Sequence, residues 1–293
     1  MKADIFKGTG VALVTPFKKD GTIDFEALEK LCDHVIRGGV DFLVALGTTS
    51  ESPVLSQDEK KAALKQIMKT ANGKIPVVVG MGGNNTLGIV DSIKAMDFEG
   101  ISGILTVAPY YNKPNQRGLY EHFKVIATAS SVPLILYNVP GRTSSNISAE
   151  TCLSLAEDFQ NIVAIKEASG DMGQIMNIVK NKPEDFVVLS GDDALTYPMM
   201  SVGAEGVISV VANAYPREFS QMVKLCLNGM YPEAMKIHYR LLDIIEALFE
   251  DGNPAGIKAA LNIMEIADNN LRLPLVKANK ATYDKLATLI DKF

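Results

Sequence analysis

Lys166 ends the apolar run of residues 162–166, and its position suggests covalent chemistry more directly than that of any other residue in the sequence. Side chains alternate between the two faces of a strand, so Lys166 shares a face with Ile162 and Ala164. If that face lines a barrel, the amine enters an enclosed interior, where loss of water favours its neutral form. A neutral lysine amine can attack a carbonyl and form a Schiff base. The alternative is a lysine that reaches solvent beside Glu167, which is the commoner arrangement at strand ends.

Tyr137 ends another apolar run, residues 133–137, and offers a proton carrier for such chemistry. By the same alternation it shares a face with Ile135, and on the adjacent strand its phenol would stand near Lys166. Carbinolamine formation, dehydration and carbon–carbon bond formation all require proton transfers, which a positioned tyrosine can carry out together with threonine hydroxyls. The alternative is a tyrosine at the rim of the core whose hydroxyl bonds to the backbone, and Tyr137 taken alone fits that better.

Two further features could bind carboxylates. The turn Gly47-Thr48-Thr49 offers two hydroxyls and backbone N–H donors without a formal charge, although local bonds within a turn would explain the same residues. Arg142 offers a two-pronged guanidinium to a second carboxylate, and the alternative is an arginine on a surface loop.

The elements that would position these residues alternate between short β-branched runs and longer amphipathic stretches, from residue 10 to about residue 227. That alternation indicates parallel βαβ units. The strand-like runs are residues 10–15, 41–46, 76–80, 103–107, 133–137, 162–166, 186–190 and 206–210, eight in all. Helix starts are indicated by Asp24, by the capping box of Ser56 and Glu59, and by Ser148. The pattern predicts an α/β protein with a (β/α)8 TIM barrel.

We expect two parts, the barrel over residues 1–227 and a C-terminal three-helix extension over residues 228–293. The helices of the extension are predicted over residues 231–250, 254–267 and 279–292, and no strand-like run interrupts them. Barrel enzymes build their sites at the carboxyl ends of the strands. The lysine, the tyrosine and both carboxylate-binding candidates follow or end such strands, so one end of the barrel would gather them.

Other signals are better explained by structure than by ligand binding. The glycines of residues 80–83 follow a strand but match neither a dinucleotide-binding nor a phosphate-binding motif. Asp192 and Asp193 are adjacent and would seldom point the same way, and we expect Asp193 to cap a helix over residues 194–200. The histidines lie singly, without metal-ligand spacing: His34, His122 and His238. We therefore predict neither a metal nor a cofactor.

Composition narrows the class of protein. The chain has 293 residues, of which 47% are hydrophobic and 22% charged, enough to bury a sizeable core. Its net charge is −5 without a basic block, which argues against a nucleic-acid partner. The N-terminal residues lack the apolar stretch of a signal peptide, and no run of apolar residues is long enough to span a membrane. The odd number of scattered cysteines suits buried thiols in a reducing compartment: Cys32, Cys152 and Cys226. We expect a cytoplasmic protein without a membrane partner.

Nearly the whole chain resembles the dihydrodipicolinate synthase family, a group of Schiff-base pyruvate aldolases. The resemblance rests on several motifs that are specific only in combination. They are Gly47-Thr48-Thr49-Ser50-Glu51-Ser52, Pro109-Tyr110-Tyr111-Asn112-Lys113-Pro114, Tyr137-Asn138-Val139-Pro140-Gly141-Arg142-Thr143, Ile165-Lys166-Glu167-Ala168-Ser169-Gly170, Ser190-Gly191-Asp192-Asp193 and Gly206-Val207-Ile208-Ser209.

The resemblance implies that pyruvate condenses with Lys166 while the turn of Thr48 and Thr49 holds its carboxylate. Tyr137, Thr48 and Tyr111 would form a proton relay, with Tyr111 supplied by a neighbouring subunit. The chain would therefore form at least a dimer, and the family suggests a homotetramer built as a dimer of dimers.

The second substrate implied by the resemblance is L-aspartate 4-semialdehyde, whose carboxylate would pair with Arg142. The enamine would attack its aldehyde, and cyclisation would give 4-hydroxy-tetrahydrodipicolinate, the first committed step of diaminopimelate and lysine biosynthesis. Gly191 and Ile208 would present backbone beside the imine. No cofactor is implied.

Two alternatives stay open. Another pyruvate-dependent aldolase, of the N-acetylneuraminate lyase or 2-keto-3-deoxy sugar acid aldolase type, would keep the imine but change the acceptor. Relatives of the lyase type lack an arginine in the loop of Arg142, which favours the synthase. The second alternative is a barrel that binds a metabolite without turnover. The combination of an interior lysine, two tyrosines and an arginine argues against it.

Family members that lysine inhibits carry an effector site at a subunit interface. Its positions correspond here to Ser52, Pro53, Gln57, Lys60, Asn84, Gly88 and Tyr110. Position 88 often holds a glutamate and position 57 a histidine, and Gly88 and Gln57 cannot take those roles. We therefore hypothesise weak or absent feedback by L-lysine.

Overall fold

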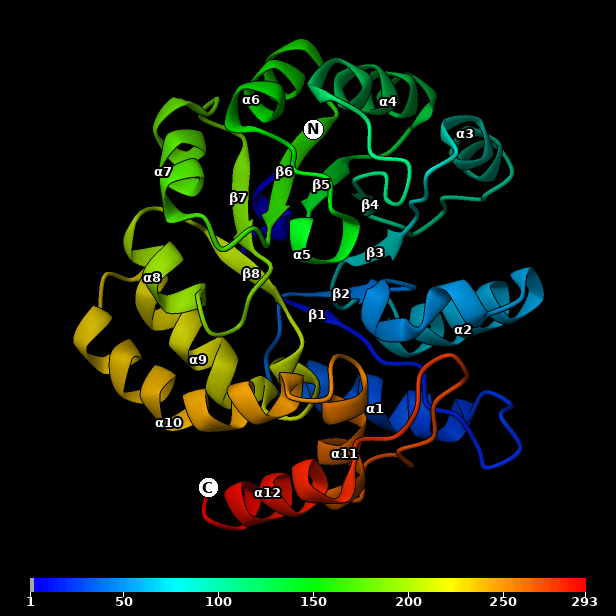
Figure 1. Cartoon of the computed structure of the whole chain (residues 1–293), viewed down its shortest axis with the longest axis vertical. Coiled ribbons are helices and arrows are strands. Elements are labelled where there is room, and N and C mark those ends of the chain that lie inside the picture. The colour runs from blue at the N-terminus through cyan, green and yellow to red at the C-terminus, as the bar shows by residue number, and fades with distance from the viewer. Residues whose placement is uncertain (1–2) are drawn as a thin grey trace.

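The structure is a computed structural model that describes residues 3–293, and its centre is a closed barrel of parallel strands surrounded by helices (Figure 1). Each strand pairs with the next along the chain, and β8 pairs with β1 to close the barrel. The strands are β1 Gly8–Ala12, β2 Phe42–Ala45, β3 Val77–Gly80, β4 Gly103–Val107, β5 Leu134–Asn138, β6 Ile162–Glu167, β7 Val187–Ser190 and β8 Gly206–Ser209. The predicted TIM barrel is confirmed, with small shifts in strand bounds.

Helices follow the strands, and most of them form the outer ring (Figure 1). They are α1 Phe25–Arg37, α2 Gln57–Ala71, α3 Thr86–Lys94, α4 Gln116–Ala129, α5 Pro140–Thr143, α6 Ala149–Asp158, α7 Met172–Asn181, α8 Thr196–Ser201 and α9 Pro216–Leu227. The predicted starts are confirmed: the side chains of Asp24 and Ser148 cap α1 and α6, and Ser56 and Glu59 form the capping box of α2. These caps satisfy N–H groups that would otherwise lack partners at the helix starts.

The apolar side chains form two separate clusters, as a barrel requires. The larger one lies between the strands and the helices, and the smaller one fills the barrel itself. Phe6, in the short 3-10 helix η1 (Ala3–Phe6), belongs to the inner cluster and packs edge-on against Phe42. Phe42 begins β2, so η1 closes the amino end of the barrel and leaves the carboxyl end for a site.

One strand departs from regular alternation. Leu134 of β5 pairs with Ile162, whereas the next residue, Ile135, pairs with Ala164, so Val163 is an extra residue in β6. Such a bulge moves the following side chains by one position. Ile162 consequently faces the outer cluster, while Val163 and Ala164 both face the barrel interior. The expectation that Ile162 shares a face with Lys166 is wrong for this reason.

Beyond α9 the chain forms α10 Tyr231–Phe249, α11 Ala255–Ile263 and α12 Lys280–Asp291, where helices were predicted. The division of the chain at residue 227 stays a prediction. The segment between α11 and α12, orange-red in Figure 1, runs past α1 toward the start of α2. Within residues 3–293, no helix combines the length and the apolar character that crossing a membrane requires.

Candidate active site

Lys166 and Tyr137 meet inside the carboxyl end of the barrel. They are direct partners across the β5–β6 pairing, and the Lys166 Nζ lies 4.3 Å from the centroid of the Tyr137 ring. Only 5% of Lys166 and 7% of Tyr137 are exposed, so the lysine does not reach solvent as the alternative supposed. Glu167 is fully buried on the other face, where its carboxylate accepts hydrogen bonds from Asn138 and Gln174.

Gly191 makes room for the lysine side chain. A Cβ at this position would lie 3.0 Å from Lys166 Cε and 3.1 Å from Lys166 Cγ, closer than such atoms ordinarily approach. The Gly191 N–H donates to the Glu167 carbonyl, which fixes the backbone beside β6. Ile208 is buried in the inner cluster together with Tyr137. The two residues expected beside the imine therefore lie against the barrel interior.

The turn after β2 is a single 3-10 turn, η2 Thr48–Ser50, which begins at Gly47. Thr48 is exposed, whereas Thr49 is buried, and its Oγ1 accepts a hydrogen bond from Asn253 Nδ2 at 2.9 Å. A residue with left-handed backbone flanks the turn on each side, Leu46 at φ 58° and Glu51 at φ 55°. Such conformations are costly for side chains of this size and are held by their surroundings.

A cavity of about 1400 Å³ reaches this end of the barrel and extends from it along α2 and α3. Thr48, Tyr137 and Arg142 all contribute to its wall. Arg142 lies on α5 and is exposed, and its guanidinium makes neither a hydrogen bond nor an ion pair with the described part of the chain. The cavity therefore places the hydroxyl groups of Thr48 and Tyr137 and the guanidinium of Arg142 in one wall. Lys166, Thr49, Gly191 and Ile208 do not line this cavity and lie deeper.

The remaining predicted residues are exposed or only partly buried, unlike Lys166. Tyr111 is 91% exposed, has left-handed backbone at φ 73°, and does not line the cavity. The effector positions divide into two groups. Ser52, Pro53, Gln57, Lys60 and Tyr110 line the outer part of the cavity, whereas Asn84 and Gly88 do not. The Asn84 side chain donates to the Tyr110 carbonyl, and Gly88 lies in the first turn of α3.

Asp193 does not cap a helix, which corrects the expectation from sequence. Its Oδ2 accepts hydrogen bonds from the Val210 and Val211 N–H groups, and Asp192 instead accepts from the residues that lead into α8. Burial raises the pKa of Asp193 to about 6, against the lowering effect of those backbone donors. Among residues 3–293 no cluster of three or more potential ligands from His, Cys, Asp and Glu could hold a metal ion.

Sequence reasoning missed a buried ion pair beside the Thr48–Thr49 turn. Lys258 of α11 pairs with Glu51, and their side chains are 1% and 0% exposed. Burial lowers the pKa of Lys258 to about 8, although the neighbouring Glu51 carboxylate acts in the opposite direction. One signal was present: Lys258 is the one charged residue in the apolar helix Ala255–Ile263. A charge is rarely buried without a partner.

Comparison with known proteins agrees with this geometry. The family described as "Dihydrodipicolinate synthetase family" matches residues 5–293. The 4-hydroxy-tetrahydrodipicolinate synthase of Parabacteroides distasonis is 52% identical over 98% of this chain and 97% of its own. That of Flavobacterium psychrophilum is 52% identical over 96% of each chain. The crystal structure of dihydrodipicolinate synthase from Thermotoga maritima, 40% identical, has a TM-score of 0.96 and covers 98% of both chains. This chain belongs to the dihydrodipicolinate synthetase family.

Proposed function

We propose that this chain condenses pyruvate with L-aspartate 4-semialdehyde to give 4-hydroxy-tetrahydrodipicolinate, through a Schiff base on Lys166. The observation that carries the proposal is the enclosed lysine of β6 in contact with Tyr137. Family membership supplies the reaction, and the arrangement of these two residues supports the role of each.

The first step is attack of the neutral Lys166 amine on the keto carbon of pyruvate. The resulting carbinolamine loses its hydroxyl as water only if that oxygen is protonated, and the Tyr137 hydroxyl is suited to deliver the proton. Removal of a proton from the methyl carbon then converts the imine to an enamine. Thr48 is exposed and lines the same cavity as Tyr137, so its hydroxyl is assigned the next position in the proton relay.

The pyruvate carboxylate is assigned to the turn of Thr48 and Thr49. Because Asn253 donates to the Thr49 oxygen, the Thr49 hydroxyl hydrogen can be donated toward a ligand. The first N–H groups of a 3-10 turn also precede its internal hydrogen bonds and can serve an anion. Neutral donors suffice at a site that is partly enclosed, as at the buried Thr49, because hydrogen bonds are stronger away from water.

The second substrate is assigned to the mouth of the cavity. The enamine carbon attacks the aldehyde and forms the new carbon–carbon bond, while Arg142 pairs with the carboxylate of the semialdehyde. Attack of the substrate amine on the imine carbon then closes the ring and releases the Lys166 amine. An exposed guanidinium with no partner among residues 3–293 is available for this role.

The oligomer is part of the proposal. Tyr111 is almost fully exposed on its own chain, so it would be useful only if a neighbouring subunit accepts it. We propose a homotetramer, a dimer of dimers, in which Tyr111 completes the proton relay of a neighbour. A cytoplasmic location is proposed as well, since Cys32, Cys152 and Cys226 are buried free thiols.

Turnover with alternative acceptors tests the reaction. Pyruvate consumption should require L-aspartate 4-semialdehyde and should not be supported by the products or acceptors of a sugar-acid aldolase. If the chain turned over N-acetylneuraminate or 2-keto-3-deoxy sugar acids but not the semialdehyde, the alternative hypothesis of another pyruvate-dependent aldolase would replace the proposal.

A further inference from the structure

Three contacts tie the C-terminal part of the chain to the turn that is assigned to the pyruvate carboxylate. Asn253, just before α11, donates to Thr49 Oγ1. Lys258, within α11, pairs with Glu51. The Arg272 N–H, between α11 and α12, donates to Glu51 Oε2 at 3.0 Å.

The central contact is the ion pair of Glu51 and Lys258. Burying two charges is unfavourable unless hydrogen bonds also satisfy their remaining atoms. Both charged groups have further hydrogen-bond partners here. Lys258 Nζ also donates to the Asn270 carbonyl at 2.9 Å, and both oxygens of Glu51 accept hydrogen bonds, one from Lys258 and one from the Arg272 N–H. The Lys258 Nζ in addition lies 4.2 Å from the centroid of the Phe17 ring. So complete a set of partners fixes the position of Glu51 tightly.

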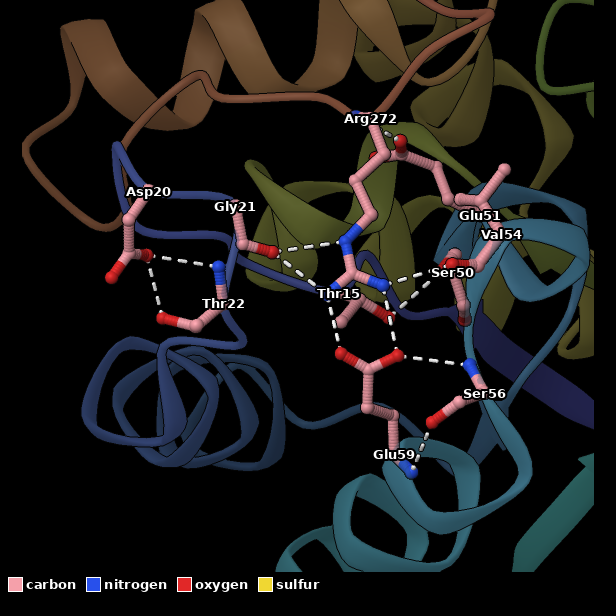
Figure 2. A network of polar contacts seen from close by, with 10 residues as sticks. All are labelled: Thr15, Asp20, Gly21, Thr22, Ser50, Glu51, Val54, Ser56, Glu59 and Arg272. Atoms are coloured by element: carbon pink, nitrogen blue, oxygen red, sulfur yellow. Dashed lines mark hydrogen bonds and ion pairs between the residues drawn. The ribbon is translucent and has the colours of Figure 1, made fainter.

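Arg272 extends the same network to the surface. Figure 2 shows its guanidinium between the loop of Gly21 and the start of α2. It donates to the Gly21 and Val54 carbonyls and forms an ion pair with Glu59, the capping-box residue of α2. Arg272 therefore holds the segment that follows the Thr48–Thr49 turn at Val54 and at Glu59.

The backbone conformation of Glu51 explains why these contacts are needed. Glu51 joins two consecutive 3-10 turns, η2 and η3 (Ser52–Val54), with φ 55° and ψ 35°. A residue with a side chain adopts this left-handed conformation only when its surroundings impose it. Without the contacts of Glu51 and Asn253, the turn would be free to relax and to move the Thr48 and Thr49 hydroxyls away from their present positions.

We infer that Glu51, Lys258 and Asn253 are positioning residues for the pyruvate carboxylate, through which the C-terminal helices hold the Thr48–Thr49 turn in its binding geometry. The inference rests on the proposed function. None of the three is assigned contact with the substrate, and their effect is on the affinity for pyruvate. The competing explanation is that the same contacts only stabilise the fold.

Glu51→Gln is the informative substitution because it keeps the shape of the side chain. Glu51 accepts from two donors, Lys258 Nζ and the Arg272 N–H, through different oxygens. An amide has one oxygen and one NH₂ group, so in either orientation one donor faces another donor. Glu250→Gln is the matched control, since Glu250 forms an exposed ion pair with Lys285 in the same C-terminal part of the chain.

Steady-state kinetics on variants that remain folded give the first readout. We expect Glu51→Gln to raise the KM for pyruvate roughly tenfold, about the effect of losing one well-made hydrogen bond, with the KM for the semialdehyde and kcat little changed. Glu250→Gln should match the parent chain. If Glu51→Gln fails to fold, Asn253→Asp takes its place: the carboxylate would accept the Thr49 hydrogen and withdraw it from the ligand, with the same selective effect.

Borohydride trapping with pyruvate separates this inference from the proposed function. If the parent chain forms no adduct at Lys166, the proposed function fails. If it does, Glu51→Gln should form the same adduct at saturating pyruvate but reach half-maximal trapping only at roughly tenfold more pyruvate. A folded variant with unchanged half-maximal trapping, or with both KM values raised equally, would overturn the positioning role.

Discussion

The Nζ of Lys166 lies 4.3 Å from the centroid of the Tyr137 ring, and the two residues are direct partners on neighbouring strands of the barrel. This relationship follows from strand register, which fixes both side chains on the interior face at the carboxyl ends of β5 and β6. It brings the proposed nucleophile and the proposed proton donor together at buried positions.

Tyr137→Phe removes the proposed proton donor while keeping the ring that packs against Lys166. We expect kcat to fall by roughly 10²- to 10³-fold, the usual contribution of general acid–base catalysis. The melting temperature should change little, because the Tyr137 hydroxyl makes no hydrogen bond to residues 3–293. Tyr120→Phe, which removes a hydroxyl that donates to Asp158 on the surface, is the control and should retain activity. Full activity of Tyr137→Phe would exclude the tyrosine from the relay.

Arg142→Ala should act on the second substrate alone. The KM for L-aspartate 4-semialdehyde is expected to rise roughly tenfold or more, because a charge-assisted hydrogen bond is lost. The KM for pyruvate should stay unchanged, since the first substrate is assigned to a different turn. Arg37→Ala, at the far end of α1, serves as the control. An equal rise of both KM values would argue against this division of the site.

Glu59→Gln should change the pH dependence of stability. The hydrogen bond from Arg272, followed by the one from the Ser56 N–H, lowers the pKa of Glu59 to about 2. A carboxyl whose pKa is lowered on folding stabilises the protein above its unfolded value of 4.5, and this is lost as the pH falls toward 2. Glutamine can still serve the capping box, so mainly the ion pair is removed.

Urea unfolding at several pH values measures this effect. The free energy of unfolding of the parent chain should exceed that of Glu59→Gln most clearly above pH 5, and the two should converge between about pH 4.5 and pH 2. Salt should reduce the difference, since the pair is only half-buried. A difference that is independent of pH would mean that packing, and not ionisation, is responsible.

L-Lysine should inhibit this chain weakly or not at all. Gly88 has no side chain to pair with the ammonium group of lysine, and Gln57 is uncharged, although the neighbouring effector positions line the cavity. Initial rates over a range of lysine concentrations check this directly. Complete inhibition by modest lysine, with the ligand located at the subunit interface, would contradict the prediction.

Much of the fold was predictable because the periodicity of apolar residues and the helix-capping residues can be recognised within short stretches of sequence. Alternating β-branched runs and helix-start signals correctly predicted the barrel, and the candidate site was predicted at the carboxyl ends of its strands. The orientation of Ile162 was not predictable, because the bulge at Val163 arises from pairing with β5 and leaves no mark in the local pattern. The role of Asp193 was misjudged because its partners, Val210 and Val211, come from the next strand–loop unit.

The ion pair of Glu51 and Lys258 could not be predicted from local sequence patterns, for a different reason. Glu51 and Lys258 are separated by 207 positions, so nothing in the spacing of either relates it to the other. Only the folded chain brings α11 against the turn after β2. A lone lysine in an apolar helix signals that some partner exists, but it does not identify the partner.

The most direct test of the proposed chemistry is the mass of the active-site peptide after borohydride reduction in the presence of pyruvate. The account predicts one reduced pyruvate adduct on the peptide that contains Lys166, and its disappearance in Lys166→Arg together with turnover. An adduct located on another lysine, or undiminished turnover by Lys166→Arg, would contradict it.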